Sequence, residues 1–336
     1  MKQKIYKRKW FKIITGAVLA IAIILVFFYW QGRPSKNIIW GINFSPAYAR
    51  YLGADPIVEF KDILTELSPK KVRLMAYWEE IEGERGKFDF RQTDALLKLA
   101  EEHNAKILMV VGRKQPHWPE CHQPEWYMGL PEIEKETVLL NFIQAAVNHF
   151  KTFPAIERWQ VENEPFFDYG KDCPITSSAF LKQEVDLVKS LDNRPVVITD
   201  SGEKGGWFQA AKFADVFGST MYRKVHNPRY GGYVQYPLPP AFYRIRAGIL
   251  RTFSHVDNII GVELQAEPWF ARDINDTPLT EQFALMNPEL FKEYTDYARS
   301  AGFSENYFWG TEWWYWLKEK QNDSSMWEAA KKVLEE

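Results

Sequence analysis

Cysteine is scarce in this sequence, and its cysteines and histidines form no compact metal-binding pattern. The 336 residues include two cysteines, Cys121 and Cys173, and six histidines. His117 and His122 lie close to Cys121, but the spacing matches no zinc site built from paired short intervals. The sequence therefore predicts no bound metal, and nothing in it indicates another cofactor.

Acidic residues are absent from the first 36 positions, which hold eight of the basic residues. The rest of the chain therefore carries 34 Lys and Arg against all 44 Asp and Glu, a net charge of −10. Because nucleic-acid binding requires a basic surface that contacts phosphates, this acidic balance argues against a nucleic-acid partner.

Charged residues are also absent between positions 13 and 30, where the sequence reads IITGAVLAIAIILVFFYW. As a helix, this stretch is long enough to cross a hydrocarbon core of about 30 Å. Six basic residues precede it, so we expect residues 1–12 to stay in the cytoplasm, 13–30 to form a single-pass membrane anchor, and 31–37 to link it to an extracytoplasmic domain. A cleaved signal peptide is the alternative, although the segment after Tyr29 offers no small-x-small cleavage site.

Aromatic residues, in contrast, are abundant, with 14 Trp, 16 Tyr and 23 Phe. Most of them must fill the core of a chain that is 46% hydrophobic. The others could line a groove for flat ligands, because the apolar face of a sugar ring stacks on aromatic side chains.

From residue 38 onward the chain has no short repeat or low-complexity linker, and short apolar runs alternate with amphipathic stretches. The apolar runs span residues 38–43, 71–77, 105–111, 156–164, 195–200, 214–222, 258–265 and 306–312. Helical spacing of apolar residues is typical of the intervening stretches 92–103, 133–150, 177–191 and 288–301. Eight alternations of strand and helix predict an α/β fold, a (β/α)8 TIM barrel over residues 38–336, although the pattern alone also fits a doubly wound sheet.

The fourth apolar run, residues 156–164, ends in carboxylates. Pro165 cannot continue a strand ladder, which places Asn163 and Glu164 at a strand-to-loop junction. In a parallel α/β barrel, active-site groups occupy this junction. Asn163-Glu164-Pro165 after a Trp-containing strand resembles the acid/base motif of the clan A glycoside hydrolases. These are retaining (β/α)8 enzymes that include cellulase-like and β-galactosidase-like families.

The second apolar run adds to this resemblance. Arg73 lies within it, Trp78 follows its end, and a Gly-x-Phe-Asp-Phe turn spans residues 86–90. This order is similar to that of β-galactosidase-like and cellulase-like members of the clan, in which Trp78 would contact substrate. An arginine inside a barrel needs a carboxylate partner. The catalytic pair would supply one, although any acidic neighbour could also do so.

The resemblance implies a retaining mechanism, which needs two carboxyl groups about 5 to 5.5 Å apart. Glu164 would be the acid/base, and the seventh apolar run offers Glu263 as the nucleophile. We expect Ile260, Val262 and Leu264 to share a helix-facing side, which would turn Glu263 into the barrel. Glu267, in a Pro-containing loop beyond the strand, is the alternative nucleophile.

The resemblance also implies roles for residues around this pair. Asn163 would hydrogen-bond the sugar 2-hydroxyl, and Tyr222 would hydrogen-bond the nucleophile unless it is an ordinary core tyrosine. Trp309 opens a Trp-rich stretch at the end of the eighth apolar run, where the clan carries a substrate-stacking tryptophan. Glu312 in the same stretch could bind a sugar hydroxyl or form a salt bridge.

The Pro-rich loop over residues 112–126 is expected to shape the site. Trp118 and Trp126 within it are candidate platforms for sugar rings, and loop packing is the alternative for both. Cys121 lies in this loop and Cys173 in the loop after the fourth strand. In an oxidising compartment they are expected to form a disulfide, with two buried free thiols as the alternative.

These patterns predict a membrane-anchored extracytoplasmic hydrolase of β-linked O-glycosyl bonds, with an oligo- or polysaccharide as substrate. A membrane-tethered carbohydrate-binding pseudoenzyme on the same barrel is the alternative, but binding alone does not require two carboxylates facing one bond. A barrel of unrelated chemistry is a third possibility, because a fold does not fix a function. The patterns specify neither the sugar, nor endo or exo action, nor the oligomeric state.

The charge pattern also generates a topological prediction. Protease added to intact cells, or to cells with a permeabilised outer membrane, should digest the barrel, because the basic N-terminus is held in the cytoplasm. Immunoblotting of tags at the two ends of the chain measures this. Full protection of the barrel under both conditions would contradict the prediction.

Overall fold

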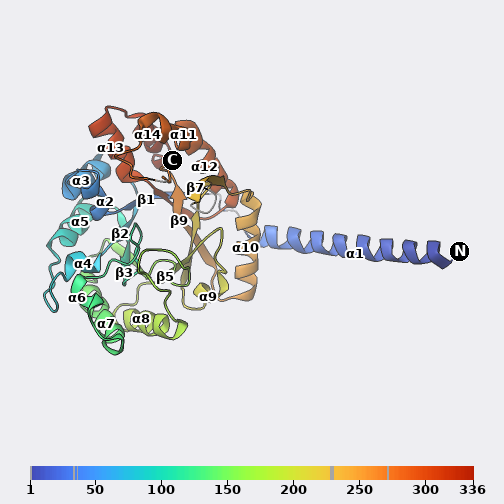
Figure 1. Cartoon of the computed structure of the whole chain (residues 1–336), viewed down its shortest axis with the longest axis horizontal. Coiled ribbons are helices and arrows are strands. Elements are labelled where there is room, and N and C mark those ends of the chain that lie inside the picture. The colour runs from blue at the N-terminus through green and yellow to red at the C-terminus, as the bar shows by residue number, and fades with distance from the viewer. Residues whose placement is uncertain (1, 33–34, 36, 228–230, 271) are drawn as a thin grey trace.

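The barrel consists of eight parallel strands that close in the order β1-β10-β9-β6-β5-β4-β3-β2 (Figure 1). The computed structural model describes residues 2–32, 35, 37–227, 231–270 and 272–336. The barrel strands are β1 (Ile39–Phe44), β2 (Lys71–Met75), β3 (Lys106–Val111), β4 (Ile156–Val161), β5 (Val196–Asp200), β6 (Val216–Met221), β9 (Asn258–Gln265) and β10 (Glu305–Trp309). The predicted (β/α)8 barrel is therefore confirmed, with every predicted strand present in the predicted order.

Helices form a ring around the barrel (Figure 1). The longer ones after the N-terminal helix are α3 (Pro56–Glu66), α5 (Arg91–Glu102), α7 (Glu132–Phe150), α8 (Ser178–Leu191), α10 (Pro240–Phe253), α12 (Pro288–Ala301), α13 (Thr311–Gln321) and α14 (Ser325–Leu334). The shorter ones are α2 (Pro46–Tyr51), α4 (Trp78–Ile81), α6 (Glu125–Met128), α9 (Phe208–Ala211) and α11 (Leu279–Leu285). The four helices predicted from apolar spacing correspond to α5, α7, α8 and α12, and their ends agree within one residue.

Side-chain caps stabilise the starts of two of these helices. The Ser177 side chain accepts a hydrogen bond from Phe180 N at the start of α8, and the Asn287 side chain accepts one from Leu290 N at the start of α12. Gly302 ends α12 with a φ of 85°, a conformation that costs glycine little.

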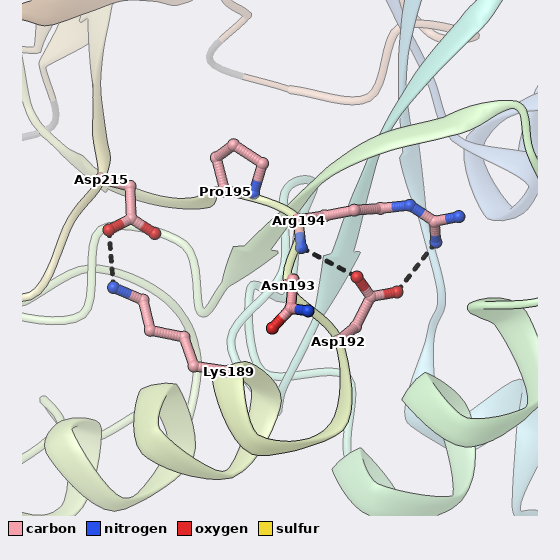
Figure 2. A pocket seen from close by; sticks show the side chains of 6 residues that line it. All are labelled: Lys189, Asp192, Asn193, Arg194, Pro195 and Asp215. Carbon is pink, nitrogen blue, oxygen red and sulfur yellow. Dashed lines mark hydrogen bonds and ion pairs between the residues drawn. The ribbon is translucent and has the colours of Figure 1, made fainter.

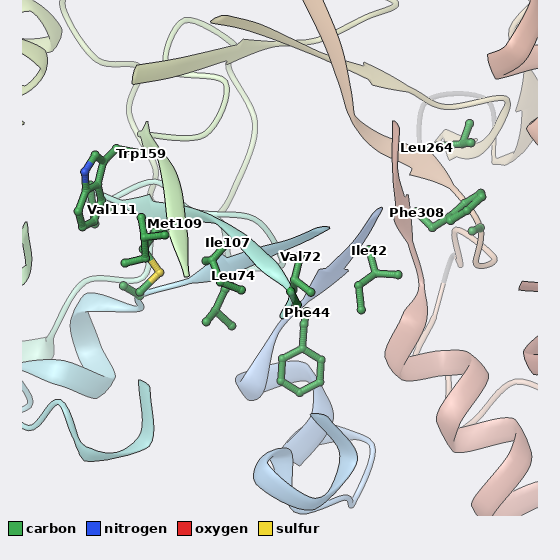
Figure 3. Close-up of a cluster of buried hydrophobic side chains, with 14 of the residues drawn as sticks. Ile42, Phe44, Val72, Leu74, Ile107, Met109, Val111, Trp159, Leu264 and Phe308 are labelled. Atoms are coloured by element: carbon green, nitrogen blue, oxygen red, sulfur yellow. The ribbon is translucent and has the colours of Figure 1, made fainter. Parts of the chain in front are cut away.

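The main hydrophobic core lies between the strands and the helix ring. Alternate strand residues such as Val72, Leu74, Ile107 and Met109 point outward into it (Figure 3). This period of two follows from the pleat of a strand. The remaining alternate residues point into the barrel, where the polar site is built.

Strand β9 departs from simple alternation, which corrects one expectation. Ile260 and Val262 do not face the helices, since they pack with Leu108, Val197 and Tyr307 from other strands, and such residues can meet only inside the barrel. The pairing register with β6 shifts within this segment, as it does with β10. A β-bulge therefore lets Val262 and its neighbour Glu263 both reach the interior, while Leu264 returns to the outer core.

Several strands are shorter than predicted, and two of them end three residues early. β4 ends at Val161, because Glu162 and Glu164 have left-handed φ values of 58° and 43° that leave the extended conformation before Pro165. β10 ends at Trp309, and residue 311 already begins α13. In addition, a small antiparallel hairpin of β7 (Lys224–Asn227) and β8 (Gly232–Gln235) follows β6.

The N-terminal helix α1 (Lys2–Gln31) leaves the helix ring beside α10 and projects into open space (Figure 1). Its segment Lys9–Gln31 is long and apolar enough to cross a membrane, and none of its most apolar window is buried in the protein. This composition fits either an anchor or a signal sequence. Arg33, Pro34 and Lys36 of the expected linker lie outside the described residues.

An ionic cluster fills the end of the barrel where the strands begin. Lys71 Nζ contacts Glu157 at 2.6 Å and Glu305 at 3.0 Å, and Arg158 Nη2 contacts Glu305 at 2.7 Å. Burial alone would raise the pKa of Glu305, but Arg158 and Lys71 outweigh it and hold that pKa below its usual value. The cluster therefore stabilises the fold while the carboxylate is charged.

Glu305→Gln should reduce the free energy of unfolding at neutral pH by about 3 kcal/mol, because it removes a buried carboxylate that pairs with both Arg158 and Lys71. Since the folded-state pKa of Glu305 is depressed, its contribution is present at neutral pH and is lost as the pH falls through that pKa. Urea unfolding of the full chain in detergent measures this, with Glu335→Gln at an exposed position as the control. The difference in the free energy of unfolding between the two variants should become smaller at acid pH. Equal stability of the two variants at neutral pH would contradict the prediction.

Candidate active site

The guanidinium group of Arg73 is the centre of the polar interior. It is fully buried. Its Nη1 donates to Glu263 Oε1 at 2.7 Å, its Nη2 to Asn163 Oδ1 at 2.8 Å, and its Nε to Gln160 Oε1 at 2.8 Å. Arg73 therefore joins β2, β4 and β9, and the carboxylate partner expected for it is Glu263.

Glu263 is held through both of its carboxylate oxygens. Tyr222 Oη donates to Oε2 at 2.8 Å, opposite the Arg73 contact on Oε1. The β9 bulge contributes to this placement, because the Val262 carbonyl accepts a hydrogen bond from Asn43 Nδ2 on β1 at 2.9 Å. Donors on both oxygens fix the direction of the carboxylate.

Glu164 lies at the turn after β4, in different surroundings. Its backbone N–H donates to Thr199 Oγ1 at 2.8 Å, and Thr220 Oγ1 lies 3.4 Å from its Oε1. Burial raises the pKa of Glu164 well above its usual value, and the negative charges of Glu263 and Glu120 raise it further. These surroundings favour the neutral, protonated form of Glu164.

Glu120 is a third carboxyl group in the site, which the sequence analysis did not identify. Its Oε2 lies 3.3 Å from the Asn163 Nδ2 donor. Burial and the charge of Glu263 raise the pKa of Glu120 to about 8. Because Glu120 lies in an irregular loop, no strand or helix period indicated that it points inward.

The sequence analysis also did not identify Lys114, which lies against the turn that carries Glu164. Its buried Nζ donates to the carbonyl oxygens of Phe167 at 2.6 Å and Glu164 at 3.2 Å. Burial lowers the pKa of Lys114, and the charges of Glu120 and Glu164 oppose that change. Lys114 thus ties the loop after β3 to the turn that carries Glu164.

A disulfide joins the same two loops, as expected. Cys121 and Cys173 are bonded, 52 residues apart in sequence. Gly170 packs against this bridge so closely that an added Cβ would lie 2.8 Å from both Cys173 Cβ and Glu120 Cβ. The loop that carries Glu120 is therefore fixed next to the Glu164 turn.

Aromatic rings line the region around the acids. Trp309 is buried beside Tyr222 and stacks on His117, with ring centroids 4.1 Å apart, and His117 in turn contacts Tyr48. Trp118 is 63% exposed and has an edge contact with Tyr169. These positions are compatible with sugar contacts for Trp309 and Trp118.

Three other predicted residues lie away from the acids or are engaged elsewhere. Trp78 is fully buried in the outer core, where it stacks on Phe142, so the structure does not bring it to the site. It is an odd number of residues after Arg73, and alternation alone therefore assigns it to the opposite face. Trp126 packs against Trp78, and Glu312 is buried and accepts a hydrogen bond from Ser45 N.

Glu267, the alternative nucleophile, is bonded quite differently from Glu263. Burial and the charge of Glu312 raise the pKa of Glu267 to about 8, although hydrogen bonds from Trp309 and Tyr48 oppose the change. A carboxyl group that is mostly protonated at neutral pH is a poor nucleophile. The surroundings thus favour Glu263 for that role.

One hollow on the surface lies apart from this site. It is lined by Lys189, Asp192, Asn193, Arg194, Pro195 and Asp215 (Figure 2). These residues precede β5 and β6, at the end of the barrel opposite the acids. Its charges are paired as Lys189 with Asp215 and Arg194 with Asp192. Within the described part of the chain, no group of three or more His, Cys, Asp or Glu is arranged to hold a metal ion.

Comparisons with known proteins agree with the barrel fold. The model of glycosyl hydrolase family 10 matches residues 75–184, a segment that contains Asn163 and Glu164. No curated protein sequence matches the chain. Together the family-model match and the closed barrel support the predicted resemblance to the clan A (β/α)8 glycoside hydrolases.

Solved structures share the fold at low sequence identity. GH5_18 from Bifidobacterium longum is 13% identical, with 82% of this chain and 70% of that chain covered and a TM-score of 0.58. Endo-glycoceramidase II from Rhodococcus sp. is 15% identical, with 81% and 73% covered and a TM-score of 0.54. An endo-β-1,4-xylanase of family 10 from Gloeophyllum trabeum is 15% identical, with 82% and 84% covered and a TM-score of 0.55.

Glu120→Gln should move the alkaline limb of the pH profile of kcat/KM to lower pH. The negative charge of Glu120 raises the pKa of Glu164, so its removal lets Glu164 lose its proton at lower pH. Peak kcat/KM should stay within about tenfold of wild type, because glutamine still offers Asn163 an acceptor. Glu125→Gln, at an exposed position near the same loop, is the control, and an alkaline limb that moves upward or not at all would contradict the prediction.

Proposed function

We propose that the chain is a retaining β-glycosidase, with Glu263 as nucleophile and Glu164 as acid/base. The observation that carries this proposal is the contrast between the two carboxyl groups. Glu263 accepts hydrogen bonds from Arg73 and Tyr222 on its two oxygens, whereas burial and nearby negative charge raise the pKa of Glu164. One environment suits a charged nucleophile and the other suits a proton donor.

In the first step, a carboxylate oxygen of Glu263 attacks the anomeric carbon as the bond to the leaving oxygen breaks. Glu164 transfers its proton to that oxygen, so the leaving group departs as a neutral alcohol. As Glu263 becomes an ester its charge disappears, which removes one of the charges that raise the pKa of Glu164. Glu164 is then left as a carboxylate, ready for the second step.

In the second step, the Glu164 carboxylate removes a proton from a water molecule, and the water oxygen attacks the anomeric carbon. The bond to Glu263 breaks and the carboxylate is restored beside Arg73 and Tyr222. Two inversions give net retention, and Glu164 is protonated again for the next cycle.

Asn163 is proposed to bind the sugar 2-hydroxyl. Its Oδ1 already accepts from Arg73 at 2.8 Å, which orients the amide so that Nδ2 points toward Glu120. A 2-hydroxyl between Asn163 and Glu120 would meet a donor and an acceptor. This arrangement supports a sugar with a free 2-hydroxyl at the position where cleavage occurs.

We further propose that α1 tethers the enzyme to a membrane, with the barrel outside the cytoplasm. The apolar segment Lys9–Gln31 supports a span, and six basic residues ahead of position 13 support a cytoplasmic N-terminus. The Cys121–Cys173 disulfide suits an oxidising compartment. The substrate would then be a carbohydrate outside the cytoplasm.

Glu263→Gln should abolish turnover of every β-glycoside, because an amide oxygen cannot form the glycosyl ester. Glu164→Gln should lower kcat/KM about 10²- to 10⁴-fold on substrates with poor leaving groups and much less on aryl glycosides, which need little protonation. Azide should restore turnover of aryl glycosides by Glu164→Gln, because it attacks the glycosyl-enzyme without a general base. Initial rates on a panel of aryl β-glycosides and β-linked polysaccharides measure this.

Glu267→Gln is the matched control, since it changes a buried carboxyl four residues away. Loss of activity in Glu267→Gln with near-normal activity in Glu263→Gln would show that Glu267, and not Glu263, is the nucleophile. After Glu164→Gln has reacted with a 2-fluoro aryl glycoside, mass spectrometry of the intact protein should show one covalently bound sugar. Wild-type protein that binds oligosaccharide but turns over none of the panel would favour the pseudoenzyme.

A further inference from the structure

Helix α10 has two faces with different partners. Tyr243, Ala247 and Leu250 belong to the main core and face the barrel. Arg244 and Gly248, which directly follow Tyr243 and Ala247 in sequence, instead meet the last turn of α1. The outward side of α10 is therefore the place where the apolar N-terminal helix joins the barrel.

The contact between α1 and α10 brings backbone against backbone. A Cβ added to Gly248 would lie 2.0 Å from Phe28 O, and a Cβ added to Gly32 would lie 2.3 Å from Arg244 O. Such close approach requires glycine on both helices. Arg251 Nη1 also donates to the Gly32 carbonyl oxygen. We call this contact of residues 28–32 with α10 the α1–α10 junction.

Aromatic and cationic groups close the junction on both sides. The Arg244 guanidinium lies 3.8 Å from the centre of the Tyr29 ring, and the rings of Phe28 and Phe253 are 5.9 Å apart. A junction that is packed in this way holds the barrel in one orientation relative to α1, whereas a flexible linker would let it rotate freely.

The length of α1 places the junction at the edge of a bilayer. Between Lys9 and the junction at Phe28, α1 has roughly 19 residues, which as a helix span about 28 Å. This length matches a hydrocarbon core of about 30 Å. The arginines of α10 would then lie at headgroup level, where their charge costs little.

Large apolar side chains are exposed on the same side of the barrel. Trp30 is 69% and Phe253 is 68% exposed, and Phe208 of α9 is 42% exposed. Phe208 lines a small hollow together with Ile249 and Leu250 of α10. Exposed aromatic residues next to an apolar helix are typical of groups that enter the interfacial region of a membrane.

We propose that the outer face of α10, with Phe253 and the neighbouring Phe208, is a membrane-contact surface that seats the barrel on its side against the bilayer. This surface would contact the lipid headgroup layer. The proposal rests on the proposed membrane anchor α1. Because α1 leaves the helix ring outward beside α10 (Figure 1), the mouth of the barrel opens along the membrane plane. The acids would meet glycans that lie beside the bilayer.

Site-specific labelling of the full chain in vesicles tests this surface. A nitrobenzoxadiazole fluorophore is attached to Phe253→Cys, to Phe208→Cys and to the control Ile133→Cys on α7, on the other side of the ring (Figure 1). The chain is reconstituted in vesicles of phosphatidylcholine and phosphatidylglycerol that carry a headgroup-level spin-label quencher. Fluorescence at positions 253 and 208 should fall at least twofold, while fluorescence at position 133, which is 89% exposed, should stay constant.

A pair of glycine variants tests whether the junction sets the orientation. Gly248→Leu cannot fit against Phe28 and should remove the quenching at position 253, while hydrolysis of a soluble aryl glycoside is unchanged. Gly16→Leu makes the same change on α1 where a Cβ meets nothing within 4 Å, and it should keep the quenching. Quenching that survives in Gly248→Leu would overturn the role of the junction.

The outcomes separate this proposal from those it rests on. A chain that fails to float with the vesicles overturns the anchor, and the contact surface with it. A chain that floats but shows equal quenching at positions 253 and 133 overturns the contact surface alone. Loss of glycosidase activity in the wild-type sample, with the expected quenching, overturns the catalytic proposal and leaves the contact surface supported.

Discussion

The site depends on one constraint, which is the burial of the Arg73 guanidinium group. Arg73 is buried inside the barrel, and a charge in that position is stable only when it is paired and fully hydrogen-bonded. Its partners come from β1, β4 and β9, namely Asn43, Gln160, Asn163 and Glu263. The requirement to satisfy one cation thus holds together strands that are distant in sequence, and it fixes the direction of the carboxylate that serves as nucleophile in the proposed mechanism.

Much of the fold could be predicted because its signals are local. Strand and helix periods act over a few residues, so all eight strands were located, and the ends of helices such as α8 and α12 were predicted to within one residue. The failures arose where the chain leaves a regular conformation. Glu162 and Glu164 adopt left-handed φ values, and the bulge in β9 changes its inward face. Neither event has a simple signature in the order of residue types.

The candidate site was predictable to the extent that residues lie at strand ends. Arg73, Tyr222 and Glu263 are brought together; the need of a buried arginine for a carboxylate predicted the first contact, and the resemblance to clan A implied the second. Glu120 could not, because a disulfide, a close glycine and a buried lysine place its loop, and all three act across distant segments. Trp78 is the opposite case. Alternation from Arg73 assigned it to the outer face, but the prediction followed the resemblance, which implied a substrate contact.

The outward departure of α1 beside α10 has a consequence for how such an enzyme would meet its substrate. A barrel held by its side would diffuse in the plane of the membrane, and its active site would stay at a fixed height above the lipid. Glycans attached within that layer experience a high effective concentration of enzyme, as linked binding partners do. Free oligosaccharides in the bulk gain nothing from the tether, so the arrangement would select substrates by their distance from the membrane as well as by their chemistry.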